Sequence, residues 1–294
     1  MATSIQTVGA ALRGDVIPPK GTDDGVVMTW LGNFTSPATK AGYWGDIQGF
    51  RAFVAAPMRH VTLADIQSYR DSLSHLAPVT VARRLSAVKS LFKFAVQQLH
   101  LPSDPAVSIK LPKIKDTLTE RILTQEQVFT LLGHVHNRRD AALLRLVYGA
   151  GLRLAEVCSL RWRDLIPREA GEGQVNVFGK GGVTRVVLIP AGLWSRVDAL
   201  RKNSGADAPV FPSRKGGPLQ ARQVHAILKT AAWRAGLSSR ISVHWLRHAH
   251  ASHALEKNCP VHIPQATLGH KSLTTTTRYT HVRPGDSSAR YLSI

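Results

Sequence analysis

Apolar side chains recur every three or four residues along most of the first 100 positions, which is the period of an amphipathic α-helix. This pattern predicts four helices, at residues 26–34, 39–54, 62–73 and 79–99. The fourth is the clearest, because one face collects Leu85, Val88, Phe92 and Ala95 and the opposite face collects Arg83, Ser86, Lys89, Ser90 and Lys93. Such a basic face is either ordinary solvated surface or a surface that contacts a phosphate backbone.

The pattern changes twice after this point. Pro102 and Pro105 end the helical run, and helical spacing returns at residues 124–132, 140–149 and 154–160. Two short runs with β character, 175–178 and 185–189, then flank a glycine-rich turn and predict a hairpin. Helical spacing resumes at residues 193–202, at 221–235 and from 244 onward.

These elements predict a mainly α protein with a small β-sheet. We expect a flexible tail over residues 1–23, an all-α domain over 24–112, a linker over 113–122, and an α+β domain over 123–294.

Charge narrows the range of partners. The 294 residues include 38 Lys and Arg against 19 Asp and Glu, a net charge of +19. The excess lies mainly beyond residue 112, where 27 basic residues face 12 acidic ones. A field of this sign favours a polyanion such as DNA, although a soluble protein can also simply be basic.

Location and redox chemistry follow from what the sequence lacks. Two cysteines form no disulfide framework, no apolar run is long enough to cross a membrane, and the N-terminus lacks the pattern of a secretory signal. We therefore expect a cytoplasmic protein with access to DNA and no membrane partner.

The segment from His244 to Tyr279 contains the candidate chemistry. His244 and Arg247 are one helical turn apart, so they share a face. Arg247, together with Arg153 at a predicted helix start, would bind phosphate oxygens in bidentate fashion. For Arg153, a surface ion pair with Glu156 is the alternative.

Three further side chains would complete a phosphoryl-transfer site. Lys180, between glycines of the hairpin turn, would protonate a leaving oxygen, His270 follows a Leu-Gly that ends a helix, and Tyr279 lies nine residues beyond His270. A tyrosine hydroxyl attacks phosphorus only when a base and a cationic pocket activate it, and His244 has the ordinary pKa of such a base. Each residue also has an ordinary reading, as an exposed turn lysine or a packed tyrosine.

Taken together and in this order, these residues resemble the tyrosine recombinase (phage integrase) family. The segments Tyr148-Gly149-x-Gly151-Leu152-Arg153-x-x-Glu156 and Tyr279-Thr280-His281-Val282 resemble it too. The helices before the linker are similar to the core-binding, SAM-like domain of that family. The resemblance covers about residues 24 to 290.

The resemblance implies a site-specific recombinase that cleaves and rejoins DNA strands through a 3′-phosphotyrosyl intermediate, with no metal or other cofactor. In that reading Tyr279 is the nucleophile, Arg153 and Arg247 clamp the phosphate, and Lys180 protonates the leaving 5′-oxygen. His244 handles the tyrosine proton, His270 supports the phosphate, and Glu156 orients the arginines. Four protomers would act on two DNA sites, with a monomer or weak dimer in the absence of DNA.

Further expectations concern DNA contacts and the terminus. Arg83, Lys89 and Lys93 on one helix and Arg222 on another are candidate DNA-binding residues. The segment 286–294 would dock on a neighbouring protomer. Tyr291 is rejected as nucleophile because it lies 21 residues past His270. The compact chain favours an Xer-like or transposon- or plasmid-type enzyme over the larger phage integrases.

Three alternatives remain open at this point. Histidines 244, 248, 250 and 253 have helical metal-ligand spacings, although no HExxH or paired CxxC motif accompanies them. A DNA-binding regulator on the same scaffold would bind DNA without forming an adduct. A topoisomerase-like enzyme of type IB would share the tyrosine chemistry. The sequence predicts neither the DNA target, nor a choice between integration, excision, inversion and dimer resolution, nor the need for accessory proteins, nor the host element.

Overall fold

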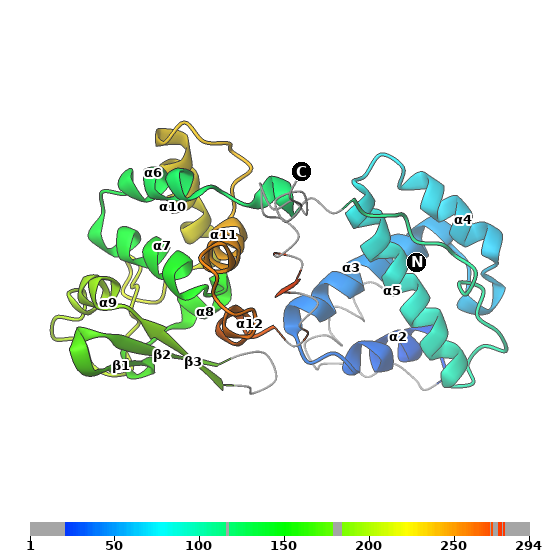
Figure 1. Ribbon diagram of the computed structural model, residues 1–294. Coiled ribbons are helices and arrows are strands. Elements are labelled where there is room, and N and C mark those ends of the chain that lie inside the picture. The colour runs from blue at the N-terminus through cyan, green and yellow to red at the C-terminus, as the bar shows by residue number, and fades with distance from the viewer. Residues whose placement is uncertain are drawn as a thin grey trace, which may run out of the picture. The chain divides into compact units, whose positions relative to one another are not determined.

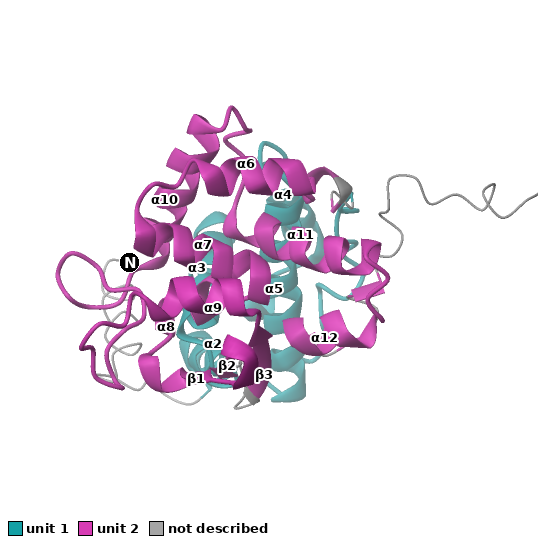
Figure 2. Ribbon diagram, turned by 60° about the vertical axis from the view of Figure 1, so that its left-hand side comes forward, with its two compact units in different colours: residues 1–115 teal, residues 116–294 magenta. Residues whose placement is uncertain are grey.

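The computed structural model describes residues 21–115, 118–178, 184–270, 272, 276–277 and 279 (Figure 1). The chain divides into two compact units, residues 1–115 and residues 116–294 (Figure 2). The division falls inside the segment 113–122, whose role as a linker stays a prediction.

Four helices build the described part of the first unit: α2 (Asp23–Gly32), α3 (Pro37–Val54), α4 (Leu63–Ser72) and α5 (Pro78–Gln97), with a 3-10 turn at Met58–His60. Thr62 caps α4 as its sequence position predicts: its hydroxyl accepts from Asp65 N, and the Asp65 carboxylate accepts from Thr62 N at 2.8 Å. The predicted apolar face of α5 is confirmed, since Leu85, Val88, Phe92 and Ala95 are all buried. They pack in one cluster with Trp30 and Phe50.

The second unit is mainly helical, with α6 (Gln125–Gly133), α7 (Arg138–Ala150), α8 (Leu154–Ser159), α9 (Ala191–Asp198), α10 (Ala221–Arg234), α11 (Val243–Glu256) and α12 (His262–Leu268). Short 3-10 turns lie at Thr119–Arg121, Trp162–Asp164 and Glu169–Gly171. Helix α7 packs against both α9 and α11 (Figure 1). The spacing Thr124-x-x-Gln127 predicts a capping box, and this box is present at the start of α6.

A three-stranded antiparallel sheet lies in this second unit, in the order β1 (Leu165–Pro167), β2 (Gly173–Phe178), β3 (Thr184–Ile189). The antiparallel pairing of β2 with β3 confirms the hairpin predicted from the β runs 175–178 and 185–189. Strand β1 was not predicted, because only Leu165 among its three residues is buried and no alternation can show in so short a strand.

The sheet packs one face against the core and leaves the other exposed. Val175, Val177 and Val187 are buried, whereas Val186 and Leu188 are exposed. Gly173 lies directly against the ring of Trp194, where a Cβ atom would overlap the indole. This contact fixes α9 on the inner face of the hairpin.

Candidate active site

The connection between α7 and α8 places the first arginine. Gly151 ends α7 with a φ of 60°, in the left-handed region that glycine adopts most readily, and Arg153 then forms the N-cap of α8. Arg153 donates from its backbone N to Glu156 Oε2 at 2.7 Å and from Nη1 to Oε1 at 2.8 Å. Its Nη2 reaches the carbonyl oxygen of Gly269 at 3.2 Å.

The second arginine extends from α11 to the same place. Arg247 is buried, donating from Nη1 to the carbonyl oxygen of Gly151 and from Nη2 to that of Leu268 at 2.5 Å. Burial and the neighbouring charge of Arg153 lower the pKa of Arg247 to about 10, which still leaves the group charged at neutral pH. Arg153 and Arg247 thus bind consecutive carbonyls at the end of α12, although 94 residues separate them in sequence.

A buried carboxylate holds this cluster together. Glu156 accepts from both Nη atoms of Arg185, at 2.9 and 2.8 Å, in addition to its two bonds from Arg153. Burial would raise the pKa of Glu156, but hydrogen bonds from Arg185 and Arg153 outweigh it and lower the pKa to about 2. The ion pair of Arg153 with Glu156 is therefore present, as part of a larger network.

The segment after α12 contains His270 and Tyr279. Gly269 ends α12 with a φ of 63°, as the Leu-Gly pair predicts. His270 Nδ1 lies 2.8 Å from Thr276 Oγ1, and its ring stacks on that of Tyr279 with centroids 6.4 Å apart. Burial, followed by the charges of the nearby arginines, lowers the pKa of His270 to about 4, so its imidazole is neutral at pH 7.

Tyr279 is buried, and its hydroxyl lies 2.7 Å from His248 Nδ1. His248 is one turn beyond His244 on α11, and the two rings stack with centroids 6.1 Å apart. Burial and the charges of Arg247 and Arg153 lower the pKa of His244. In this structure the phenol is therefore hydrogen-bonded to His248, which sequence reasoning considered only as a metal ligand.

Comparison with known proteins decides the family. The model of the phage integrase family matches residues 121–285, and that of the phage integrase N-terminal SAM-like domain matches residues 31–98. Tyrosine recombinase XerC of Xylella fastidiosa (strain M23) is 36% identical over 248 residues, covering 81% of this chain and 81% of the relative. Tyrosine recombinase XerC of Myxococcus xanthus is 35% identical over 269 residues, covering 84% and 88%.

The chain belongs to the phage integrase family. It is a tyrosine site-specific recombinase, and the comparisons give no support to a regulator or a topoisomerase. Among solved structures, the fold is similar to XerH bound to a palindromic difH substrate (TM-score 0.72, 18% identity, covering 94% of this chain and 90% of that one). It is also similar to a lambda integrase dimer bound to a COC′ core site (TM-score 0.71, 20% identity, covering 88% and 78%).

Some residues predicted for this recombinase fall outside the described part. Lys180 belongs to the segment 179–183 between β2 and β3, and Tyr291 and the predicted docking segment 286–294 follow the last described residue. Their roles therefore stay predictions.

A cavity of about 560 Å³ opens beside two of the proposed residues of the recombinase. Arg153 and His244 line it, together with Ser159, Gln220 and Cys158. Arg153 is more exposed than Arg247, with 38% of its side chain accessible. The cavity gives a ligand access to one guanidinium and one imidazole at once.

The other histidines of α11 serve the packing of the recombinase. His253 shares one hydrogen bond with the hydroxyl of Tyr148 and another with the carbonyl of Leu123, both at 2.9 Å. His250 shares one with the carbonyl of Tyr148 at 2.8 Å. Among the described residues, no group of three or more His, Cys, Asp or Glu side chains is arranged to hold a metal ion.

The basic face of α5 needs one correction. The Lys89 ammonium lies 2.8 Å from each of the carbonyl oxygens of Ala106, Val107 and Ile109, so its three N–H groups are directed to the protein rather than to a phosphate. Arg83 is half exposed and pairs with Asp46, and Lys93 is exposed. DNA contact by Arg83 and Lys93 stays a prediction.

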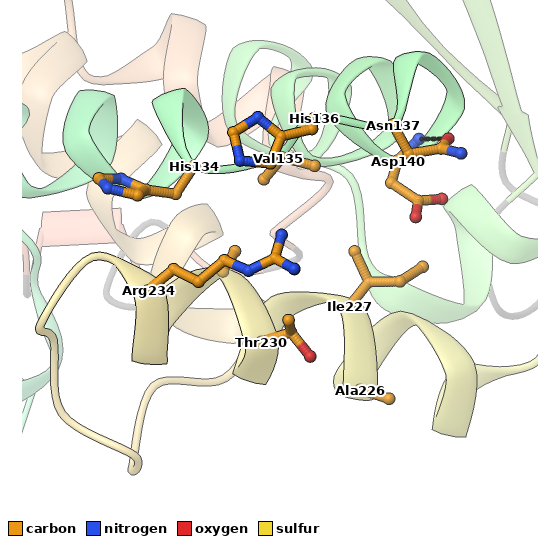
Figure 3. A pocket seen from close by; sticks show the side chains of 10 residues that line it. His134, Val135, His136, Asn137, Asp140, Ala226, Ile227, Thr230 and Arg234 are labelled. Carbon is orange, nitrogen blue, oxygen red and sulfur yellow. Dashed lines mark hydrogen bonds between the residues drawn. The ribbon is translucent and has the colours of Figure 1, made fainter.

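Two of the further cavities in the second unit of the recombinase are lined by basic residues or histidines. Exposed Arg222 lines one of about 880 Å³ with Arg139, Arg214 and Lys215, so its predicted DNA contact would have basic neighbours. The other, about 330 Å³, lies between the α6–α7 connection and α10, with His134 and His136 on one side and Arg234 on the other (Figure 3). No residue predicted for catalysis lines either cavity.

Proposed function

We propose that Tyr279 is the nucleophile of this recombinase and that Arg153 and Arg247 bind the phosphate it attacks. The observation that carries the proposal is the convergence of both guanidinium groups on the Leu268 and Gly269 carbonyls, directly before His270. A phosphodiester under attack gathers negative charge on its non-bridging oxygens, and fixed guanidinium groups stabilise that charge without reorganisation.

In the proposed reaction the Tyr279 oxygen bonds to phosphorus while the bond from phosphorus to the 5′-oxygen breaks. Lys180 gives a proton to the leaving 5′-oxygen, which becomes a hydroxyl. The phenol proton passes to His248, the imidazole within hydrogen-bond distance of Oη, which revises the expectation that His244 takes it. His244, beside Arg153 in the cavity, donates to a phosphate oxygen, and His270 supports the same phosphate. Glu156 holds Arg153 in position.

The covalent 3′-phosphotyrosyl bond conserves the energy of the diester. The free 5′-hydroxyl of a second duplex attacks it, releases Tyr279 and completes strand exchange. No metal or other cofactor enters this scheme.

We further propose that four protomers act on two double-stranded DNA sites and that the protein is a monomer or weak dimer off DNA. A lambda integrase tetramer bound to a Holliday junction has a fold similar to this chain, with a TM-score of 0.70 and 20% identity. Arg83, Lys93 and Arg222 contribute to DNA binding in this proposal. We also propose that recombination takes place in the cytoplasm. Separately, no helix among the described residues is long and apolar enough to cross a membrane.

A suicide-substrate assay tests the assignment. The protein first selects its binding site from random duplexes. That site is then nicked next to the cleaved phosphate, so that the short fragment with the free 5′-hydroxyl diffuses away and the adduct accumulates. We expect a covalent band with the native chain and with Tyr291→Phe, and none with Tyr279→Phe. A band that survives Tyr279→Phe but is lost in Tyr291→Phe would reject the proposal.

A further inference from the structure

We propose that Arg185 is a positioning residue of the recombinase: it holds Glu156, and through Glu156 it holds Arg153 against the reacting phosphate. The inference rests on the proposed function of Arg153. Arg185 is the second residue of β3, and its side chain is only 11% exposed. In the sequence it begins the β run 185–189, whose pattern indicates no role for it.

The hydrogen bonds of Glu156 give Arg185 and Arg153 different roles. Each Glu156 oxygen accepts one bond from Arg185 and one from Arg153, at 2.9 and 2.8 Å on Oε1 and at 2.8 and 2.7 Å on Oε2. The carboxylate is thus fully engaged, and its plane is fixed by the guanidinium of Arg185. Arg185 presents its donors to the protein, whereas Arg153 keeps 38% of its side chain accessible to a ligand.

The last turn of α12 supplies the second anchor. Arg185 Nε donates to the carbonyl oxygen of Thr267 at 2.7 Å. The next two carbonyls accept from Arg247 at 2.5 Å and from Arg153 at 3.2 Å. The final carbonyls of a helix lack partners within the helix and carry its negative partial charge, so three consecutive ones form a ladder that orders three guanidinium groups.

Gly269 leaves room for the Arg185 side chain at the end of α12. Its left-handed φ of 63° turns the chain away at the end of α12, and a Cβ atom added there would lie 3.1 Å from Arg185 Cδ. The Arg185 side chain therefore connects β3 to both α8 and the end of α12, and Figure 1 shows these elements next to one another.

Arginine is required at this position for a geometric reason. Contact with both Glu156 oxygens and with the Thr267 carbonyl uses Nη1, Nη2 and Nε of one planar fork. A lysine keeps the charge but offers a single nitrogen, so it cannot make the three contacts at once. Arg185→Lys then leaves Glu156 free to turn, and Arg153 turns with it.

The test uses the full chain and three nicked substrates. One carries the normal phosphate at the cleaved position, one a neutral methylphosphonate, and one a 5′-bridging sulfur. Methylphosphonate lacks the charge that Arg153 would balance, and a 5′-thiolate leaves without being protonated. The rate of adduct formation is measured with DNA saturating, for Arg153→Lys, Arg185→Lys and the native chain. Arg168→Lys is the matched control, because Arg168 is an exposed arginine of the same sheet region, bonded to Gln174 Oε1 at 2.9 Å.

We expect Arg185→Lys to slow cleavage of the normal phosphate about 10- to 100-fold, as loss of a supporting contact does. The ratio of variant to native rate should return to near one on methylphosphonate, as it should for Arg153→Lys, and should stay low on the sulfur substrate. Arg168→Lys should match the native chain on all three substrates.

Three results would overturn the inference. They are a native rate for Arg185→Lys on the normal phosphate, an equal loss on all three substrates, and a rescue by the sulfur substrate, which would instead link Arg185 to leaving-group protonation. If Arg153→Lys is not rescued by methylphosphonate, the proposed role of Arg153 fails and this inference falls with it. If only Arg185→Lys is not rescued, the inference alone fails. Should Arg185→Lys not fold, as judged by circular dichroism, the planar Arg185→Gln replaces it in the same comparison.

Discussion

Replacing Glu156 by glutamine removes the buried anion between Arg153 and Arg185 with almost no change of shape. The carboxylate is 8% exposed and accepts four hydrogen bonds from Arg153 and Arg185. A glutamine keeps one oxygen acceptor but turns an N–H₂ group toward guanidinium donors. We therefore expect a loss of stability in the second unit that depends on pH.

The size of the loss follows from the pKa of Glu156, which falls from 4.5 to about 2 because its hydrogen bonds outweigh its burial. One decade of acidity corresponds to about 1.4 kcal/mol, so the ionised carboxylate contributes about 3 kcal/mol to folding at pH 7. A carboxyl with a lowered pKa stabilises the fold above its unfolded pKa, and this stabilisation is lost as the pH falls from about 4.5 to 2. At pH 3 about 1.4 kcal/mol would remain.

Pulse-labelling hydrogen exchange in urea measures the free energy of unfolding of the second unit. Peptides from β2, β3 and α8 report on that unit separately from the first. The difference in free energy of unfolding between the native chain and Glu156→Gln should be about 3 kcal/mol at pH 7 and should fall by about half at pH 3. The exposed Glu172→Gln is the matched control and should change stability by less than about 0.5 kcal/mol. A loss under about 1 kcal/mol at pH 7, or one that is equal at both pH values, would refute the reasoning.

Three further predictions follow from individual contacts. Gly173→Ala should destabilise the second unit by about 3 kcal/mol in urea denaturation, because its Cβ would overlap the Trp194 ring. Gly192→Ala is the control, since a Cβ there would have nothing within 4 Å. Equal effects of the two substitutions would contradict the close contact of Gly173 with Trp194. His270, whose pKa is lowered to about 4 by burial and by Arg247, Arg153 and Arg185, should stay neutral down to about pH 5 in an NMR titration of the DNA-free protein, assigned with His270→Gln; a midpoint near 6.5 would count against it. Lys89→Met should cost the first unit about 2 kcal/mol by orphaning three carbonyls, while exposed Lys93→Met should cost little; a similar cost for both would mean that the carbonyl contacts of Lys89 are unimportant.

The helices and the hairpin were predictable because their signals are local. The apolar stripe of α5 and the capping box of α6 involve residues three or four apart, and the structure confirms both. Strand β1 gave no such signal, since a three-residue strand with one buried position shows no periodicity.

The candidate site was predictable only in part, because its contacts join distant segments. Glu156 and Arg185 are 29 residues apart, and Arg185 and Thr267 are 82 apart, so no spacing rule links them. Lys89 shows the same limit: its position on a basic helix face predicts a phosphate contact, but the segment after α5 folds back and engages it. His248 was visible as a neighbour of Arg247, yet only the fold brings it to the hydroxyl of Tyr279.

The central claim is that Tyr279 forms the covalent bond to DNA, and mass spectrometry of the trapped adduct tests it most directly. Trypsin cleaves after Arg278 and Arg290 but not before Pro284, so residues 279–290 and 291–294 form separate peptides with one tyrosine each. After nuclease digestion, the account predicts a nucleotide remnant on the peptide 279–290, joined to Tyr279. A remnant on the peptide 291–294, or on any other residue, would contradict it.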